Sequence, residues 1–160
     1  SEKERLLNEA SSQRNVYIAY IIEFAIETGM RRSEILKLRW SDVDLESGFA
    51  SLYDTKNGED RRVPLTRKCI EVLKTLPQND QKVFPISTTC LRLAWNRARK
   101  KTGITDLRFH DLRHEAVSRF FEMGMSVPEV ALISGHKDVR QLLRYTHLNP
   151  TNVFRKYKEF

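Results

Sequence analysis

The sequence has few cysteines and no long apolar run. Its two cysteines, Cys69 and Cys90, are too few for a disulfide scaffold, and no neighbouring residues give them the spacing of a metal site. The longest apolar stretch, residues 16–26, is interrupted by Glu23 and is shorter than the roughly 20 residues that a membrane span needs. These absences predict an intracellular protein with no membrane partner. They leave catalysis by a cysteine open.

What the chain does contain is ordinary for a folded domain, except in its charge. Its 160 residues are about one domain long, and 40% apolar with 31% charged residues argues against disorder. The net charge of +7 lies in the C-terminal part: residues 1–90 hold 14 basic and 14 acidic side chains, whereas residues 91–160 hold 14 basic and 7 acidic. This asymmetry indicates either a polyanionic partner, nucleic acid first, or a solvated basic face.

Hydrophobic periodicity predicts a mostly α-helical domain with a small antiparallel β-sheet, an α+β fold. Helix-ending glycines follow two of the periodic runs, at Gly29 and Gly135, and Asn57-Gly58 predicts a β-hairpin. No repeat, low-complexity run or clear linker divides the chain. We expect strands over 49–54 and 61–65 and helices over 2–10, 15–28, 32–38, 66–76, 88–101, 110–123, 127–134, 139–147 and 150–158.

One basic residue lies on the apolar side of its predicted helix. With residues 110–123 placed at about 100° per residue, Arg113 falls near the middle of the apolar arc and His110 at its edge, one turn away. A guanidinium that faces a core is costly unless it is paired, so an anion should meet Arg113. That anion is either an internal carboxylate, which we prefer on this feature alone, or a phosphate, whose oxygens suit arginine's planar fork.

Two further segments contain residues suited to hold an anion. In Thr28-Gly29-Met30-Arg31-Arg32-Ser33-Glu34, one helix ends at glycine and another begins about two residues later, which brings backbone amides and Arg31 together. Glu34 is a ready partner for an arginine or a histidine. Near the C-terminus, His136 follows a helix end, and Tyr145 stands among basic residues that lower the cost of forming a phenolate. The alternatives are surface arginines, a polar loop histidine and a packing tyrosine.

Together these segments resemble the catalytic domain of the tyrosine recombinases, the phage integrase family. Each matching stretch is weak singly, whereas five in the family's order and spacing are highly specific. The five stretches are Thr28–Glu34, Thr55-Lys56, His110-Asp-Leu-Arg113-His114, Ser134-Gly135-His136 and Tyr145-Thr-His147. Serine in place of leucine at position 134, and Glu115 in place of threonine, indicate similarity to temperate-phage and prophage integrases rather than to chromosome-dimer-resolving recombinases.

The resemblance implies how a phosphate would be held. Arg31 and Arg113 would be the two phosphate-clamping arginines, and His110 and His136 the histidine pair. Glu34 matches the acidic residue that supports the site. The resemblance also leaves His110 with two possible roles, as the proton acceptor for the tyrosine or as another phosphate donor.

The resemblance further implies the reaction. Tyr145 would attack a DNA phosphodiester to give a 3′-phosphotyrosyl intermediate and a free 5′-hydroxyl. Lys56, on the predicted hairpin, would give the leaving oxygen its proton as general acid. Because the covalent link keeps the bond energy, strand exchange would need no metal, ATP or other cofactor.

Partners and domain organisation follow from the same resemblance. The expected substrate is double-stranded DNA at a specific core site, in the bacterial cytoplasm or nucleoid. Residues 1–160 would form one catalytic domain without the N-terminal core-binding domain of the family, and the full-length protein would form a tetramer on DNA. Residues 149–160 would either pack on their own domain or dock on a neighbouring protomer.

Three other functions stay open at this level. Gly124 between two predicted helices partly fits a non-catalytic helix-turn-helix regulator, although Phe120 stands where a small residue is usual. His110 and His114 have the i, i+4 spacing of zinc ligands, but an acidic third ligand at a suitable spacing is missing. A type IB topoisomerase would share the strand-cutting chemistry and differ in its product.

Overall fold

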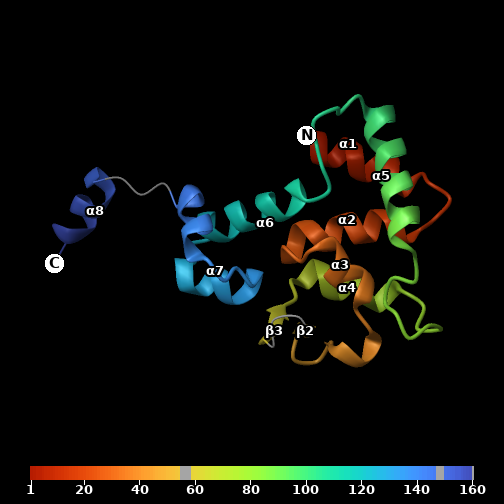
Figure 1. Ribbon diagram of the computed structural model, residues 1–160, viewed down its shortest axis with the longest axis horizontal. Coiled ribbons are helices and arrows are strands. Elements are labelled where there is room, and N and C mark those ends of the chain that lie inside the picture. Colours follow the sequence, from red (N-terminus) through yellow and green to blue (C-terminus); the bar gives the residue numbers. More distant parts are fainter. Residues whose placement is uncertain (55–58, 147–149, 160) are drawn as a thin grey trace.

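Helices make up most of the fold and surround one central helix, α2 (Figure 1). The computed structural model describes residues 1–54, 59–146 and 150–159. Two 3₁₀ helices are present, η1 (Trp40–Asp42) and η2 (Val139–Tyr145). The α-helices are α1 (Glu2–Ser11), α2 (Tyr17–Thr28), α3 (Arg32–Lys37), α4 (Arg67–Thr75), α5 (Thr88–Thr102), α6 (Asp111–Glu122), α7 (Val127–Ser134) and α8 (Pro150–Tyr157).

Helix α2 is buried on several sides because five other helices contact it: α1, α3, α4, α5 and α6. The predicted apolar face, with Ile21 and Ile22, is fully buried, and so is Phe24, whose ring meets that of Phe84 edge to face at 5.5 Å. The helix ends at Gly29, which adopts the left-handed conformation with φ of 68°. The C-terminal end of this central helix therefore lies in the middle of the fold.

A three-stranded antiparallel sheet packs beside the helices, in the order β1 (Val43–Asp44), β2 (Phe49–Asp54) and β3 (Glu59–Pro64). The predicted hairpin strands are confirmed, with Ala50 paired to Val63 and both fully buried. Strand β1 and η1 were not predicted, because two or three residues are too short to establish a period. The expected turn and Lys56 lie at residues 55–58, outside the described residues.

The buried apolar residues form two clusters, and α6 contributes to both. The larger cluster contains residues from each of the helices α1 through α5, from the sheet, and Leu112 at the start of α6. The smaller one consists of Ala116, Val117 and Phe120 of α6 together with Val130 of α7 and Leu142 of η2. Helix α6 thus connects the main body to the α7–η2 part, as Figure 1 shows.

Two expectations for the C-terminal region are corrected. Residues 139–145 form a 3₁₀ helix rather than an α-helix, and it begins at Asp138, whose side chain accepts a hydrogen bond from the amide of Arg140. Helix α8 does not pack on its own domain: Val153, Phe154 and Tyr157 are 55–77% exposed, and the helix stands away from the rest of the chain (Figure 1).

Two observations bear on the functions that composition left open. Cys69 is buried in the larger cluster, and burial raises the pKa of its thiol to about 12, so it is a packing residue rather than a nucleophile. None of the described helices is both long and apolar enough to span a bilayer.

Replacing Leu142 with alanine should destabilise the protein by about 2–5 kcal/mol, because its fully buried side chain fills the smaller cluster. The matched control is Leu143→Ala, since this neighbouring leucine is 47% exposed and should change the stability by about 0.5 kcal/mol at most. Urea unfolding followed by circular dichroism measures both. Equal losses from the two substitutions would contradict the packing described here.

Candidate active site

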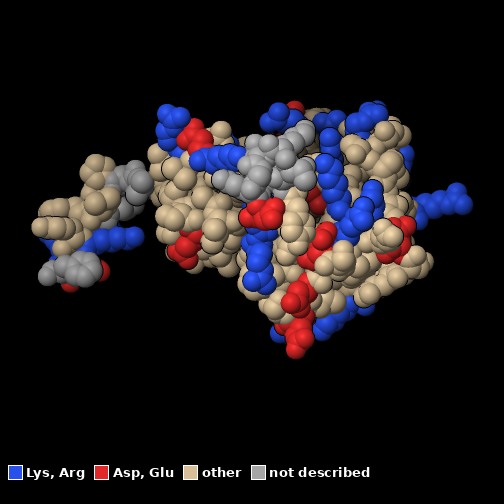
Figure 2. Space-filling model, turned by 60° about the horizontal axis from the view of Figure 1, so that its bottom comes forward, with Lys and Arg blue, Asp and Glu red and all other residues tan. Residues whose placement is uncertain are grey.

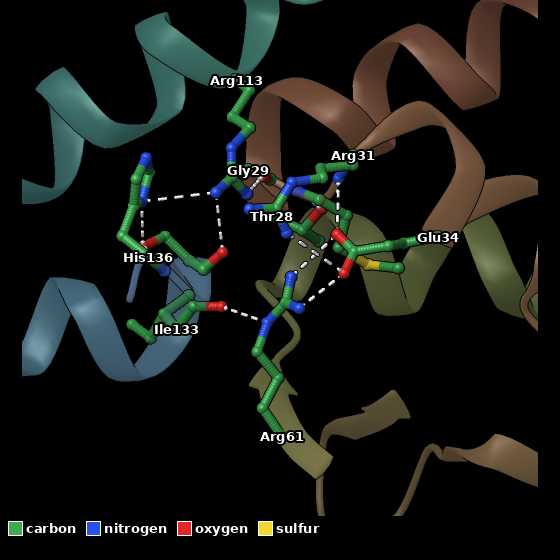
Figure 3. A network of polar contacts seen from close by, with 10 residues as sticks. Thr28, Gly29, Arg31, Glu34, Arg61, Arg113, Ile133 and His136 are labelled. Atoms are coloured by element: carbon green, nitrogen blue, oxygen red, sulfur yellow. Dashed lines mark hydrogen bonds and ion pairs between the residues drawn. The ribbon is translucent and has the colours of Figure 1, made fainter. Parts of the chain in front are cut away.

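The buried guanidinium of Arg113 is the centre of the site (Figure 3). Only 3% of this residue is exposed, yet none of the described carboxylates forms an ion pair with it. Its Nη1 donates to the carbonyl oxygen of Gly29 at 2.7 Å, and its Nη2 donates to that of Ser134 at 2.8 Å. The preference for an internal carboxylate was therefore wrong. Burial first, and then the charge of Arg31, lower the pKa of Arg113 to about 10, so it stays charged at neutral pH.

Both carbonyls that hold Arg113 lie at the C-terminal ends of helices. Gly29 is the residue that ends α2, and Ser134 is the last residue of α7, which Gly135 ends with φ of 73°. Helix C-termini carry unpaired carbonyls and a partial negative charge. Two helix ends thus solvate the guanidinium without neutralising it, so its charge remains available to an anion.

Arg31 is the residue that begins α3, and Glu34 lies in the first turn of that helix. The backbone amide of Arg31 donates to Glu34 Oε1 at 2.8 Å, and Arg31 Nη1 lies 3.6 Å from Glu34 Oε2. Gly29 permits the turn between α2 and α3 because its φ of 68° is one that residues with a side chain rarely adopt. Burial alone would raise the pKa of Glu34, but hydrogen bonds from Arg61 and from the amide of Arg31 hold it below its usual range.

Arg61 of β3 is a site residue that sequence reasoning missed. Its Nη1 and Nη2 donate to the two oxygens of Glu34 at 2.5 and 2.8 Å, and its Nε donates to the carbonyl oxygen of Ile133 at 3.0 Å (Figure 3). The side chain therefore ties the start of α3 to the end of α7. The only signal in the sequence was that Glu34 needed a partner; nothing in the strand indicated which arginine would supply it.

His136 follows α7 and contacts Arg113. Its Nδ1 lies 3.3 Å from Arg113 Nη2 and 2.6 Å from the hydroxyl of the fully buried Ser134. Because a guanidinium can only donate, we assign Nδ1 as the acceptor and place the ring hydrogen on Nε2. Burial, followed by the charges of Arg113 and Arg31, lowers the pKa of His136 to about 4, so the ring is a neutral donor at pH 7.

A hollow of about 340 Å³, the α3–α6 hollow, opens beside these groups. Its lining holds four arginines and no acidic residue. His110 is exposed at its edge, and burial by the surrounding residues, followed by the charges of His114 and Arg113, lowers the pKa of His110. The lining residues are Met30, Arg31, Arg32, Ser33, Arg108, Phe109, His110 and Arg113.

Tyr145 is the last residue of η2 and lies next to His114 of α6. Its hydroxyl is 2.6 Å from His114 Nδ1 and accepts a hydrogen bond from Arg144 Nη2 at 2.9 Å. The tyrosine ring is stacked on Phe121, with centroids 6.3 Å apart, and the rings of His114 and His110 are 5.1 Å apart. Tyr145 is thus connected to the α3–α6 hollow through two histidines on one face of α6.

The structure brings most of the predicted site residues together. Arg31, His110 and Arg113 line the α3–α6 hollow, and each remaining described residue contacts a neighbour: His136 contacts Arg113, Glu34 contacts Arg31, and Tyr145 contacts His114. Lys56 lies outside the described residues.

On the face drawn in Figure 2, Lys and Arg side chains gather mainly in the upper part and acidic ones mainly in the lower part.

The arrangement of these groups suits an oxyanion such as a phosphate group, with a tyrosine beside it. The chain belongs to the phage integrase family, whose model matches residues 1–152. The resemblance proposed from the five sequence stretches is therefore confirmed, together with the α+β fold of the catalytic domain.

Individual relatives agree with this assignment. A shufflon-specific DNA recombinase of Escherichia coli is 44% identical over 158 residues, which cover 98% of this chain and 41% of that protein. The integrase of Salmonella phage P22 is 29% identical over 95% of this chain and 43% of its own length. The crystallised catalytic domain of bacteriophage HP1 integrase superposes with a TM-score of 0.79 at 25% identity, covering 98% of this chain and 90% of that one. The chain spans less than half the length of the first two relatives.

Replacing Gly135 with alanine should cost more stability than replacing Gly103. Both glycines have φ of 73°, which costs an alanine about 1–2 kcal/mol, but a Cβ at Gly135 would lie 2.9 Å from the Arg61 guanidinium, whereas one at Gly103 meets nothing within 4 Å. Urea unfolding of both variants isolates the contact with Arg61. Equal losses would mean that Arg61 moves away without breaking its bonds to Glu34 and Ile133.

Stability should fall as the pH is lowered from 7 to 5. The folded-state pKa of His136, about 4, lies below the ordinary value near 6.5, so the unfolded chain binds more protons in this range; the stabilisation is present above pH 6.5 and is lost toward pH 4. Thermal unfolding across the range measures the effect. His136→Asn, which can keep an acceptor toward Arg113, should flatten the curve; an unchanged slope would contradict the assignment.

Proposed function

We propose that this chain is the catalytic domain of a site-specific DNA recombinase in which Tyr145 is the nucleophile. The observation that supports this most is the buried charge of Arg113, which lacks an ion-pair partner among the described residues, lines the α3–α6 hollow with Arg31 and His110, and contacts His136. A charge left unpaired inside a protein costs free energy that a bound anion recovers. Family membership makes the phosphodiester of DNA the fitting anion.

The reaction is a phosphoryl transfer to a tyrosine. The phenolic oxygen of Tyr145 forms a bond to phosphorus while the bond to the 5′-oxygen breaks, which leaves a 3′-phosphotyrosyl link and a 5′-hydroxyl. Charge develops on the phosphate oxygens during the attack, and Arg31, Arg113 and the Nε2–H of His136 are fixed donors that stabilise it. Preorganised donors are effective because no reorientation is needed when the charge appears.

The leaving 5′-oxygen needs a proton, and the resemblance assigns this role to Lys56. The residue lies outside the described residues, so the assignment depends on the match in sequence alone. The second strand's 5′-hydroxyl later attacks the phosphotyrosyl link and releases Tyr145. Because the link conserves the bond energy, the proposed cycle consumes no nucleotide triphosphate and needs no metal or other cofactor.

The proposed partner is double-stranded DNA, in the bacterial cytoplasm or nucleoid. Solved relatives with this fold include a XerH recombinase bound to its difH substrate and a lambda integrase dimer bound to a core site. The excess of basic side chains in residues 91–160 suits a polyanion. Residues 1–160 are proposed as one catalytic domain that works beside the family's N-terminal core-binding domain.

We further propose that the full-length protein forms a tetramer on DNA, in which the exposed apolar face of α8 docks on a neighbouring copy. Val153, Phe154 and Tyr157 form that face and are exposed here. The alternatives are less favoured. A helix-turn-helix regulator or a zinc enzyme leaves the four cationic and imidazole groups and Tyr145 without a common purpose, and a type IB topoisomerase differs from this proposal in its product.

The proposal predicts a covalent complex with DNA through Tyr145. We would incubate the protein with a pool of nicked duplexes of random sequence, isolate the denaturant-resistant adducts, sequence the DNA and map the linked peptide by mass spectrometry. Wild type and the control Tyr53→Phe, at an exposed position of β2, should form adducts, whereas Tyr145→Phe should form none.

Arg113→Ala should reduce adduct formation by at least about 100-fold, while DNA retention at low salt largely persists, because one positioned donor of this kind contributes that much. Strand exchange between two selected duplexes then distinguishes recombination from simple relaxation of supercoils. An intact adduct yield in Arg113→Ala, or linkage through a residue other than Tyr145, would overturn the proposed function.

A further inference from the structure

We propose that His114 is the group that takes the proton from Tyr145 during the attack on phosphorus. This inference rests on the proposed function and assigns the proton acceptor that the sequence left open. His114 immediately follows Arg113 in α6, so the residue that binds the phosphate and the residue that activates the nucleophile would be neighbours in the chain.

The hydrogen-bond geometry defines the direction of proton transfer. Tyr145 Oη and His114 Nδ1 are 2.6 Å apart, and Arg144 Nη2 lies 2.9 Å from Oη and 3.1 Å from Nδ1. A guanidinium can only donate, so it supplies a hydrogen to Oη, and the phenolic hydrogen points to Nδ1. His114 then carries its own hydrogen on Nε2 and accepts at Nδ1, which is the arrangement of a base poised beside its acid.

Packing holds both partners of this hydrogen bond. His114 lies near the start of α6, on a part of the helix that the buried residues Arg113 and Ala116 fix in the core. On the other side, the ring of Tyr145 is stacked on Phe121, and Leu142, three residues earlier in η2, is fully buried. The contact therefore joins two elements of the smaller apolar cluster rather than two free surface side chains.

His110 is less suited to this role. None of the hydrogen bonds found among the described residues joins His110 to Tyr145, whereas His110 lines the α3–α6 hollow together with Arg31 and Arg113. The two histidines, one helical turn apart, thus face different partners. We assign His110 to the phosphate and His114 to the nucleophile.

The surroundings of His114 keep it ready to accept a proton. Burial first, and then the charge of Arg144, lower its pKa below the ordinary value, so the ring is neutral at pH 7. The same Arg144 guanidinium donates a hydrogen bond to Tyr145 Oη at 2.9 Å. The charged and titratable groups around His114 are Arg144, Tyr145, Asp111, Arg108, Arg113 and His110.

Proton transfers accompany both bond changes at phosphorus. The bond between Tyr145 Oη and phosphorus forms, the phosphorus–O5′ bond breaks, and the phenolic proton moves to His114 Nδ1, while the leaving oxygen takes its proton from the general acid proposed as Lys56. In the return step the 5′-hydroxyl attacks phosphorus and gives its proton back to the group that protonated it, while Tyr145 Oη leaves phosphorus and takes its own proton from the His114 imidazolium. His114 therefore serves both cleavage and rejoining.

The test uses His114→Asn and the selected nicked duplex in single-turnover measurements of adduct formation. Asparagine can accept a hydrogen bond near the position of Nδ1 but cannot take the proton, so we expect cleavage to slow by about 100-fold or more. The wild-type rate should rise with pH through the lowered pKa of His114 and then level off. In the variant this inflection should be lost, and the rate should keep rising above neutral pH as hydroxide takes over removal of the proton.

A second measurement separates proton transfer from positioning. Replacing Tyr145 with 3,5-difluorotyrosine, whose phenol is more acidic, should restore most of the lost rate in His114→Asn. The same replacement should not restore His110→Asn, because that histidine is assigned to the phosphate.

The outcomes distinguish this inference from the function on which it rests. If wild type forms no adduct, the proposed function fails. If wild type forms the adduct, then a His114→Asn variant at the wild-type rate, or one that difluorotyrosine does not rescue, overturns the role of His114 while leaving the recombinase assignment intact.

Discussion

The rest of the site depends on a guanidinium that is buried without a carboxylate partner among the described residues. Arg113 is held by two carbonyl oxygens, and each is supplied by the C-terminal end of a helix. Partial charges at helix ends solvate a cation but do not cancel it, so the interior keeps a net positive charge. The positions of α2, α6 and α7 are therefore coupled: all three helices must meet at one point for this charge to be tolerated at all.

A second ionic contact keeps that meeting point in place. The bidentate pair between Arg61 and Glu34, together with the bond from Arg61 to Ile133, joins the sheet, the start of α3 and the end of α7. These segments belong to different parts of the fold, since α7 packs in the smaller apolar cluster. A partly buried bidentate pair has a defined geometry, which suits a residue that holds others in position rather than reacting itself.

The nucleophile is attached differently from the groups that would bind the phosphate. Tyr145 lies at the end of a 3₁₀ helix anchored by Leu142, and its hydroxyl is engaged by His114 and Arg144. The anion-holding groups lie nearer the body of the fold. A site divided in this way permits the tyrosine to be activated by its own neighbours while the phosphate is held by others.

Much of this molecule could be predicted from the order of its residues. Helical periodicity located α2, α5, α6 and α7 to within about two residues, and five short motifs identified the family and gathered Arg31, His110, Arg113, His136 and Tyr145 into one expected site. Local patterns succeed here because a helix face, a capping glycine or a motif is encoded by neighbouring residues.

Only the tertiary structure determined which side chains contact one another. The sequence indicated that Arg113 needed compensation, but only the fold replaced the expected carboxylate with two carbonyls, paired Glu34 with Arg61 across 27 residues, and set His114 against Tyr145 across 31. Such contacts join distant residues through the packing of whole helices, and neither periodicity nor composition carries information about that arrangement.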